Sequence, residues 1–448
     1  MTYISNTDAE RKEMLAAIGV SSFSDLLAPI PENIRLRGDL NVPQALDEPG
    51  LVRHLQTLAA RNLDMESHLS FLGAGIYDHF RPSVVSALVS RGEFATSYTP
   101  YQPELSQGML QAMYEYQTMI CALTGMDLSN ASMYDGATGL AEAALMAIQI
   151  RERPEVVVSG AVHPHYRQVL ATYLASTGHK LVETPYGDRE ALRRAASAQT
   201  ACVIVQQPDF FGCLEDVGGM VEAAHRAGAL AIIAVDPIAL GLLKPPGELD
   251  VDIVVGEGQS LGNAPGYGGP LLGFFACKKN FARSFPGRIV GATTDIDGRR
   301  AYTMTLRTRE QDIRREKATS NICTNEALLA LAATVYLSEV GKEGLRQIAD
   351  LCLQKAHYAR QQLTQLPGVT ARFAERPFFK EFVVRLPVAP EAVNRRLLQD
   401  RLIGGLPLGP YYSELRDSML VCVTETKTKD DIDRFVTAFG RALQEGKE

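Results

Sequence analysis

The sequence contains no dense run of lysine or arginine and no excess of positive charge. Its formal net charge is -7 at pH 7, and its isoelectric point is near 5.7. Proteins that bind nucleic acid neutralise phosphates with clustered basic side chains. Because the sequence has no such cluster, nucleic acid is a poor candidate partner.

Long apolar runs are also missing. A membrane-spanning helix needs roughly 18 apolar residues, and no segment reaches that length. Residues 1–11 are polar and lack the apolar stretch of a secretory signal. We therefore expect a soluble protein of the cytoplasm with no membrane contact.

The seven cysteines are scattered through apolar segments, and none of them forms a CxxC pair. Because their number is odd and zinc sites need paired spacing, we expect reduced cysteines in the core and no metal site. His163, Pro164 and His165 offer two imidazoles without a nearby cysteine or carboxylate cluster. A turn that enters a helix is the better interpretation of this segment.

The composition predicts a folded chain with more than one core. It has 448 residues, of which 46% are hydrophobic and 22% are charged. We predict an arm over residues 1–60, a large domain over 61–325, and a helical connection with a smaller domain over 326–448. The arm alternates short helical patterns with proline-containing stretches, so we expect it to pack on something larger.

Residues 154–278 alternate between strand-like and helical patterns. Apolar runs such as Leu230 to Val235 are typical of parallel strands buried on both faces. The pattern predicts an α/β fold with a large, mostly parallel sheet, followed by a smaller C-terminal α/β unit. The strands that we expect in the large sheet are Val156 to Val158, Leu181 to Val182, Ala201 to Val205, Ala231 to Val235, Asp252 to Val255 and Leu271 to Ala276.

Asp236 is the first candidate for a functional residue, because it follows directly on an apolar run. Ligands of open α/β sheets lie beyond the carboxyl ends of the strands, where a carboxylate can pair with a pyridinium nitrogen. An Asp-Pro turn that only ends the strand is the plain alternative.

A turn of small residues, Tyr134 to Gly139, leads into the next helix. Gly136 and Thr138 there would present backbone amides at a helix N-terminus, which favours an anion such as a phosphate. The alternative is a helix cap in which Asp135 or Thr138 satisfies the free amides. Both interpretations remain open from residue type alone.

Seven glycines between Gly256 and Gly273 surround another strand end. They match neither GxGxxG at the start of a helix nor the P-loop pattern, so a nucleotide-binding loop is excluded. We expect either a close backbone approach beneath a ligand or a neighbouring subunit, or a plain tight turn.

Four phrases, in this order, resemble the glycine decarboxylase P-protein of the glycine cleavage system. They are Phe71 to Gly75, Tyr98 to Glu104, Tyr116 to Ile120 and Lys317 to Thr324. The likeness covers nearly the whole chain. The length is about half that of one-chain members and matches the N-terminal half that some organisms make as a separate subunit.

The resemblance implies a fold-type I pyridoxal phosphate architecture and a particular reaction. A lysine holds pyridoxal phosphate as a Schiff base, glycine loses carbon dioxide, and the aminomethyl group passes to the lipoyl arm of H-protein. The resemblance places that lysine just ahead of a glycine-rich turn, where this chain has Gln259. An amide cannot form a Schiff base, and Lys244 and Lys278 lie too early and too late to replace the lysine.

The leading hypothesis is therefore a subunit without covalent cofactor. A lysine-bearing partner, the second P-protein subunit, would hold pyridoxal phosphate, and this chain would lend side chains to the partner's site while Gly136, Thr138 and Asp236 form a degenerate pocket. The preferred lenders are Tyr98, Tyr101, Gln102 and Glu104, and the weaker candidates are Arg307, Arg314, Arg315 and Lys317.

Two alternatives remain. One is a scaffold that only docks H-protein and stabilises its partner. The other is a self-sufficient pyridoxal phosphate enzyme, such as an aminotransferase or a desulfurase, that uses an unforeseen lysine.

One position departs from the resemblance. Asp312 stands where related sequences commonly carry histidine or another uncharged side chain. We expect the charge to change local contacts, and we assign the position no catalytic role.

Overall fold

The computed structural model describes residues 5–96 and 99–445. The chain forms two compact units, Met1–Leu63 and Asp64–Glu448. The first unit contains three helices, and none of their residues is buried. These helices are α1 (Asp8–Ile18), α2 (Phe23–Leu26) and α3 (Glu48–Ala59).

The centre of the second unit is a seven-stranded sheet with the order β2-β8-β7-β6-β5-β3-β4. The strands β4, β3, β5, β6 and β7 run parallel, whereas β8 and β2 are antiparallel to their neighbours. The predicted α/β fold with a mostly parallel sheet is confirmed. The strands are β2 (Leu128–Ser129), β3 (Glu155–Ser159), β4 (Lys180–Thr184), β5 (Thr200–Gln207), β6 (Leu230–Val235), β7 (Ile253–Glu257) and β8 (Gly273–Cys277).

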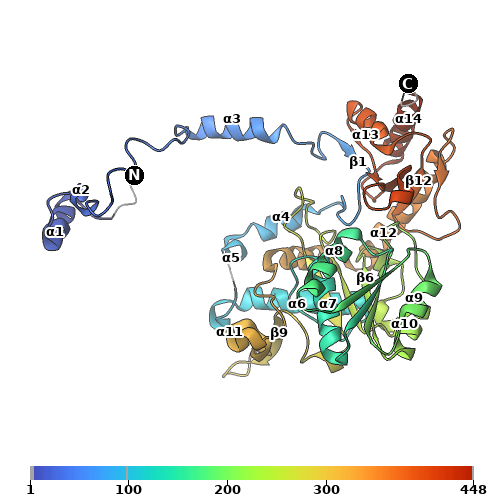
Figure 1. Cartoon of the computed structure of the whole chain (residues 1–448), viewed down its shortest axis with the longest axis horizontal. Helices are drawn as coiled ribbons and strands as arrows, with labels where there is room; N and C mark the ends of the chain where they lie inside the picture. The colour runs from blue at the N-terminus through green and yellow to red at the C-terminus, as the bar shows by residue number, and fades with distance from the viewer. Residues whose placement is uncertain (1–4, 97–98, 446–448) are drawn as a thin grey trace. The chain divides into compact units, whose positions relative to one another are not determined.

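Helices cover both faces of this sheet (Figure 1). Helices α7 and α8 pack on one face, and α6, α9, α10 and the first half of α12 pack on the other. The bounds are α6 (Gln107–Thr124), α7 (Gly136–Arg151), α8 (Pro164–Ala175), α9 (Arg189–Ala195), α10 (Val217–Arg226) and α12 (Ala327–Leu363).

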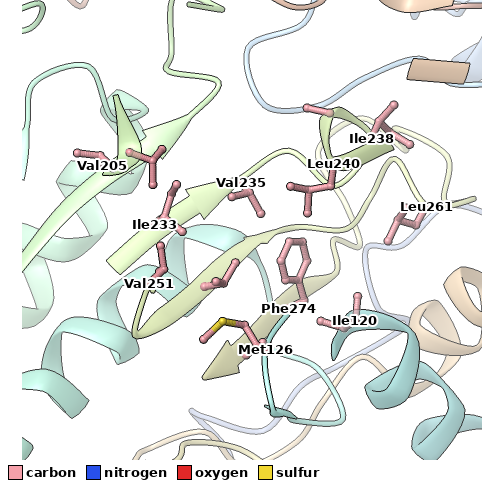
Figure 2. Packing of buried hydrophobic residues seen from close by; sticks show 14 of the residues in the cluster. Ile120, Met126, Val205, Ile233, Val235, Ile238, Leu240, Val251, Leu261 and Phe274 are labelled. Carbon is pink, nitrogen blue, oxygen red and sulfur yellow. The ribbon is translucent and has the colours of Figure 1, made fainter. Parts of the chain in front are cut away.

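Strand β6 lies in the middle of the sheet, and all of its residues are buried. Because side chains alternate along a strand, Ile233 and Val235 point into one cluster, whereas Ile232 and Ala234 point into the other. Figure 2 shows Val235 between Ile233 and Phe274. Each buried valine or isoleucine stabilises the fold by about 1.5–3 kcal/mol, so the continuous apolar run holds the end of β6 firmly in place.

The C-terminal part has an antiparallel four-stranded sheet with the order β11-β12-β15-β14. Helix α12 leads into it and is interrupted at Gly341, where φ is 56°. The expected boundaries at residues 60 and 325 remain predictions. The elements are β11 (Thr370–Ala371), β12 (Glu381–Arg385), α13 (Pro390–Gln399), β14 (Leu406–Pro407), β15 (Ser418–Cys422) and α14 (Lys429–Glu445).

Several short elements connect these layers. Strand β1 pairs in parallel with β13, and β9 and β10 form an antiparallel pair. The bounds are β1 (Leu69–Ser70), α4 (Ser83–Val89), α5 (Gly92–Ala95), β9 (Ile289–Thr294), β10 (Arg300–Thr305), α11 (Gln311–Arg314) and β13 (Leu402–Ile403). In the part of the chain that the structure describes, no helix combines the length and the apolar character needed to cross a membrane.

The expectation of reduced core cysteines holds for most of them. All seven thiols are free, and five are buried. Cys121 is only partly buried and Cys323 is exposed. The expectation is wrong for Cys323, because this residue lies in the irregular segment before α12 rather than in a strand or helix.

Gly212 marks a close approach between the two sheets, and it provides a test of their packing. Its φ is +82°, and an added Cβ would lie 1.9 Å from the carbonyl oxygen of Glu381. We expect Gly212→Ala to cost about 2–5 kcal/mol, from left-handed backbone strain plus overpacking. The change is measured as the shift of the urea unfolding midpoint.

Gly218→Ala is the matched control. Gly218 lies in α10, and an added Cβ would meet no atom within 4 Å. Alanine favours a helix over glycine by up to about 1 kcal/mol, so this variant should be as stable as the wild type or slightly more stable. Equal midpoints for the two variants would contradict the assigned packing at Gly212.

Candidate functional site

Asp236 lies at the carboxyl end of β6 and uses both of its carboxylate oxygens. Oδ1 accepts a hydrogen bond from the backbone N–H of Ile238 at 3.0 Å, which is the expected turn chemistry. Oδ2 lies 2.6 Å from Nζ of Lys380. The residue therefore ends a strand and also binds a positive charge, and that charge comes from the chain itself.

Lys380 is one of the site residues that the sequence analysis missed. It precedes β12, and its side chain is only 2% exposed. Its Nζ lies 3.5 Å from the centre of the Tyr77 ring and 3.0 Å from Nε2 of His79. Burial opposes the charged form and is the largest single effect, but the attraction of Asp236 together with that of Cys422 and Cys352 exceeds it, and the pKa of Lys380 is raised. The lysine is therefore a buried ammonium held by a carboxylate and an aromatic face.

The network continues from His79 to Glu425. Nδ1 of His79 lies 2.6 Å from Oε2 of Glu425, and the Cys352 thiol lies 3.4 Å from the same oxygen. The His79 bond helps to hold the pKa of Glu425 at about 2 although burial acts in the opposite direction. These three residues also lie close enough to share a metal ion. Their atoms already pair with one another, and the Lys380 ammonium lies beside His79, so we interpret them as a hydrogen-bonded network.

Gln259 is 1% exposed, and its amide is fully engaged. Oε1 accepts from the backbone N–H of Tyr77 at 2.9 Å. Nε2 donates to the carbonyl oxygens of Tyr77 at 3.0 Å and Asn263 at 2.7 Å. The amide therefore fixes the Tyr77 segment against the end of β7.

The N-terminus of α7 is satisfied by two carboxylates of this chain. Asp135 caps the helix by accepting from Thr138 N–H at 2.7 Å. Glu257 accepts from Gly136 N–H at 3.1 Å and from two other backbone amides. Burial raises the pKa of Glu257 to about 7, while these donors favour its charged form. Asp135, and not Thr138, is the capping side chain.

The glycine cluster approaches elements of the same chain. A Cβ on Gly256 would lie 2.3 Å from the Phe274 ring, and one on Gly262 would lie 2.7 Å from Tyr336. Gly266, Gly268 and Gly269 have positive φ values, as a tight turn requires. The tight turn is therefore present, and the close approaches of Gly256 and Gly262 are to strand and helix side chains of the same chain. An approach beneath a ligand or a neighbouring subunit stays a prediction.

Among the described residues, two small cavities border Asp236. One of about 30 Å³ is lined by Tyr77, His163 and Tyr166 among others, and one of about 20 Å³ is lined by Lys380 and Glu381 among others. Each has room for about one or two water molecules. Small-molecule sites typically measure roughly 300–1,000 Å³. These residues therefore do not fit a cofactor of the size of pyridoxal phosphate.

A second cluster forms around Tyr101, which is 42% exposed. Arg288 donates to the Tyr101 hydroxyl at 2.5 Å, and the guanidinium carbons of Arg288 and Arg307 both lie 5.0 Å from the Tyr101 ring centre. Arg288 is buried and lies 3.5 Å from Glu310. The sequence analysis did not identify Arg288, because a single arginine next to Gly287 carries no motif.

Most of the other residues proposed to contribute side chains to the partner's site are exposed. Gln102 and Glu104 are exposed, as are Arg314, Arg315 and Lys317, whereas Tyr98 lies outside the described residues. Asp312 forms an ion pair with Arg307, which accounts for the local effect expected of its charge. The structure brings Tyr101 and Arg307 together. It links Asp236, Gln259 and Gly136 in a separate buried network, in which Lys380, Tyr77 and Glu257 make the connections.

His163 caps α8, as expected of a turn that enters a helix. Nδ1 accepts from His165 N–H at 3.1 Å, and Nε2 lies 2.8 Å from the carbonyl oxygen of Ala74. A neutral ring with its proton on Nε2 satisfies both contacts. Burial lowers the pKa of His163 to about 4, which keeps the ring neutral.

Comparisons with known proteins agree on one family. Residues 1–439 match the profile described as "Glycine cleavage system P-protein". A "Probable glycine dehydrogenase (decarboxylating) subunit 1" from Desulfitobacterium hafniense is 52% identical over 444 residues, covering 98% of this chain and 99% of the relative. A relative with the same description from Moorella thermoacetica is 51% identical over 442 residues, covering 98% of this chain and 99% of the relative.

Solved structures extend the comparison to the fold. A crystal structure of glycine decarboxylase (P-protein), in inhibitor-bound form, is 45% identical with a TM-score of 0.90, covering 99% of this chain and 100% of that one. Sphingosine-1-phosphate lyase from Burkholderia pseudomallei is 17% identical with a TM-score of 0.66, covering 93% and 94% of the two chains. The predicted fold-type I architecture is confirmed.

The Asp236–Lys380 pair predicts a strong dependence of stability on both partners. Lys380→Met leaves a buried carboxylate unpaired, and we expect a loss of about 3–5 kcal/mol in the free energy of unfolding. Adding Asp236→Asn should restore much of the loss, because neither position of the pair then carries an unpaired buried charge. Lys429→Met, which breaks a surface pair with Asp433, is the control and should leave the urea midpoint unchanged. Additive effects of the two site substitutions would contradict the pairing.

His163 predicts an acid-sensitive component of stability. Its folded-state pKa of about 4 lies below the ordinary value of 6.5, so the unfolded chain binds more protons in this range. Stability should therefore fall by about 3 kcal/mol as the pH falls from 6.5 to 4. Urea unfolding at several pH values should show a smaller decrease for His163→Leu than for the wild type. Parallel curves would show that His163 does not account for the decrease.

Proposed function

The chain belongs to the glycine cleavage system P-protein family and is a subunit 1 of its glycine-decarboxylating enzyme, and on that premise we propose how it contributes to catalysis. A second subunit carries the lysine and holds pyridoxal phosphate. This chain completes that subunit's site with side chains from the loop around Tyr101. The observation that carries this proposal is a contrast between two regions of the chain. The pocket around Asp236 is filled by the chain's own side chains, whereas the loop around Tyr101 is exposed and held in place by its neighbours.

Three features support the assignment of the cofactor to the partner. Gln259 stands at the lysine position and cannot form a Schiff base. Lys380, the lysine nearest to Asp236, is a protonated ammonium in an ion pair, whereas a Schiff base requires a neutral amine. The cavities beside Asp236 have volumes of about 20 and 30 Å³. A self-sufficient enzyme is therefore the weaker interpretation.

Lys244 and Lys278 do not change this conclusion. Lys244 lies 4.0 Å from Glu248 in a largely exposed pair. Lys278 donates to Asp250 at 2.6 Å and to Asp252 at 2.8 Å at the opposite end of the sheet strands from Asp236. Neither lysine lies in the network around Gln259.

The loop around Tyr101 combines exposed side chains with rigid support. Tyr101, Gln102 and Glu104 are exposed, yet Arg288 holds the Tyr101 side chain in place by donating to its hydroxyl. Gln107 anchors the end of the loop by exchanging two hydrogen bonds, each 2.9 Å long, with the backbone of Tyr302. Exposed polar groups on a fixed support are suited to completing a neighbouring site. We propose Tyr98 as a further lender on the sequence pattern alone.

The proposed reaction follows the family. Glycine is decarboxylated in the partner's site, and the aminomethyl group passes to the lipoyl arm of H-protein. When bound, pyridoxal phosphate acts as the electron sink. The residues of this chain would orient substrate and exclude water at the edge of that site. We further propose that the assembly works in the cytoplasm.

Gln102→Ala tests the lending of side chains. In a complex reconstituted with the partner subunit and H-protein, we expect turnover to fall roughly tenfold or more, because an oriented contact is lost at the reacting site. Gel filtration should show the same complex as for the wild type. Gln168→Ala changes an exposed glutamine on α8 and serves as the matched control. It should leave both turnover and assembly unchanged.

The same experiment separates lending from a scaffold role. Tyr101→Phe removes the hydroxyl that Arg288 contacts, and it should also reduce turnover while assembly persists. Intact assembly with unchanged turnover in both variants would favour a scaffold that only docks H-protein and stabilises its partner.

A further inference from the structure

We propose that side chains of this chain fill the positions at which the fold would hold pyridoxal phosphate, so that the site is a permanently closed structural core. An ammonium group lies where the pyridinium nitrogen would lie, and a carboxylate lies where the phosphate would lie. The inference rests on the proposed assignment of the cofactor to the partner, and it specifies what excludes the cofactor here. Three positions carry the argument.

The first position is the carboxylate of Asp236. A pyridinium nitrogen would bring a positive N–H group to this carboxylate. Lys380 already brings one, with Nζ 2.6 Å from Oδ2. The ammonium is buried on the Tyr77 ring and contacts His79, so it has no solvent-exposed position to move to without breaking these contacts. A cofactor ring would have to displace a buried, paired charge.

The second position is the N-terminus of α7, where a phosphate would accept from backbone amides. The Glu257 carboxylate accepts from Gly136 N–H at 3.1 Å, and its other oxygen accepts from the N–H groups of Gln259 at 3.0 Å and Leu272 at 2.8 Å. The Tyr166 hydroxyl also lies against Gly136, where an added Cβ would be 2.3 Å from it. An incoming phosphate would meet a carboxyl group that already occupies these amides and a tyrosine side chain at this helix end.

The third position is Gln259 itself. Its amide both accepts from the N–H and donates to the carbonyl of Tyr77. A lysine has donors but no acceptor, so it cannot make the bond to Tyr77 N–H. Restoring the lysine would therefore remove one contact of the Tyr77 segment and leave the other two positions filled.

These contacts also connect segments that are distant in the sequence. Glu381 accepts from Ala74 N–H at 2.7 Å and from the Tyr77 hydroxyl at 2.8 Å. Lys427 donates to Asp78 at 2.7 Å. The C-terminal part is thus fastened to the segment from Ala74 to Asp78 by internal charges. No ligand is needed for this closure.

The test is whether the lysine alone restores cofactor binding. Full-length wild type, Gln259→Lys and Gln259→Lys/Lys380→Met are incubated with pyridoxal phosphate, reduced with borohydride and mapped by peptide mass spectrometry. Gln168→Lys on the surface of α8 is the control for reaction with an accessible lysine. Circular dichroism and the urea midpoint verify that each variant is folded.

We expect no reduced adduct at position 259 in Gln259→Lys, and at least tenfold more adduct there in the double variant. A stoichiometric adduct in Gln259→Lys would overturn the closed site, whether or not the double variant folds. No adduct in a folded double variant would overturn the role given to Lys380.

Failure of this inference can be distinguished from failure of the proposed function. The labelling uses this chain alone, so it does not depend on the contribution of Gln102 to turnover. An adduct in Gln259→Lys would contradict the closed site and leave the lending of the loop untouched. Unchanged turnover in the loop variants would contradict the lending of side chains and leave the closed site untouched.

Discussion

The buried ion pair between Asp236 and Lys380 is the interaction on which the rest of the site depends. It places the positive charge of one sheet against the strand end of the other. Neither group is tolerated alone in this environment, because an unpaired buried charge costs several kcal/mol. Tyr77, His79 and the Glu425 carboxylate are arranged around that pair. The segment from Gly73 to His79 is consequently held between the two sheets.

A core held by these contacts leaves an enzyme-like fold little room for chemistry in its own pocket. Enzymes that act on small molecules need an open pocket and a reactive group, and here the space beside Asp236 is divided into cavities of about 20 and 30 Å³. The polar groups that face outward lie elsewhere, on the loop supported by Arg288 and Arg307. Under the proposed function, the chain uses the pocket around Asp236 for cohesion and offers side chains to its partner from the exposed loop. This division suits a subunit whose chemistry is completed by its partner.

The fold could be predicted from the sequence because its determinants are local. Apolar runs such as Leu230 to Val235 define buried parallel strands, and Gly125 ends α6 in a left-handed conformation. Asp236 was identified because it follows directly on a strand, and Gln259 was identified because the family resemblance places a lysine at that position. Lys380 and Arg288 were not, because their partners lie more than a hundred residues away in the sequence. A charge that is neutralised only by tertiary contact has no local pattern.

The cofactor content of the reconstituted complex tests the central claim most directly. Equal amounts of this chain and its partner subunit are assembled, reduced with borohydride, and separated before the pyridoxyl groups are counted on each chain. The account predicts one group for each pair of subunits, all on the partner, and no visible cofactor absorbance in this chain when purified alone. A pyridoxyl group on this chain, or two groups for each pair, would contradict it.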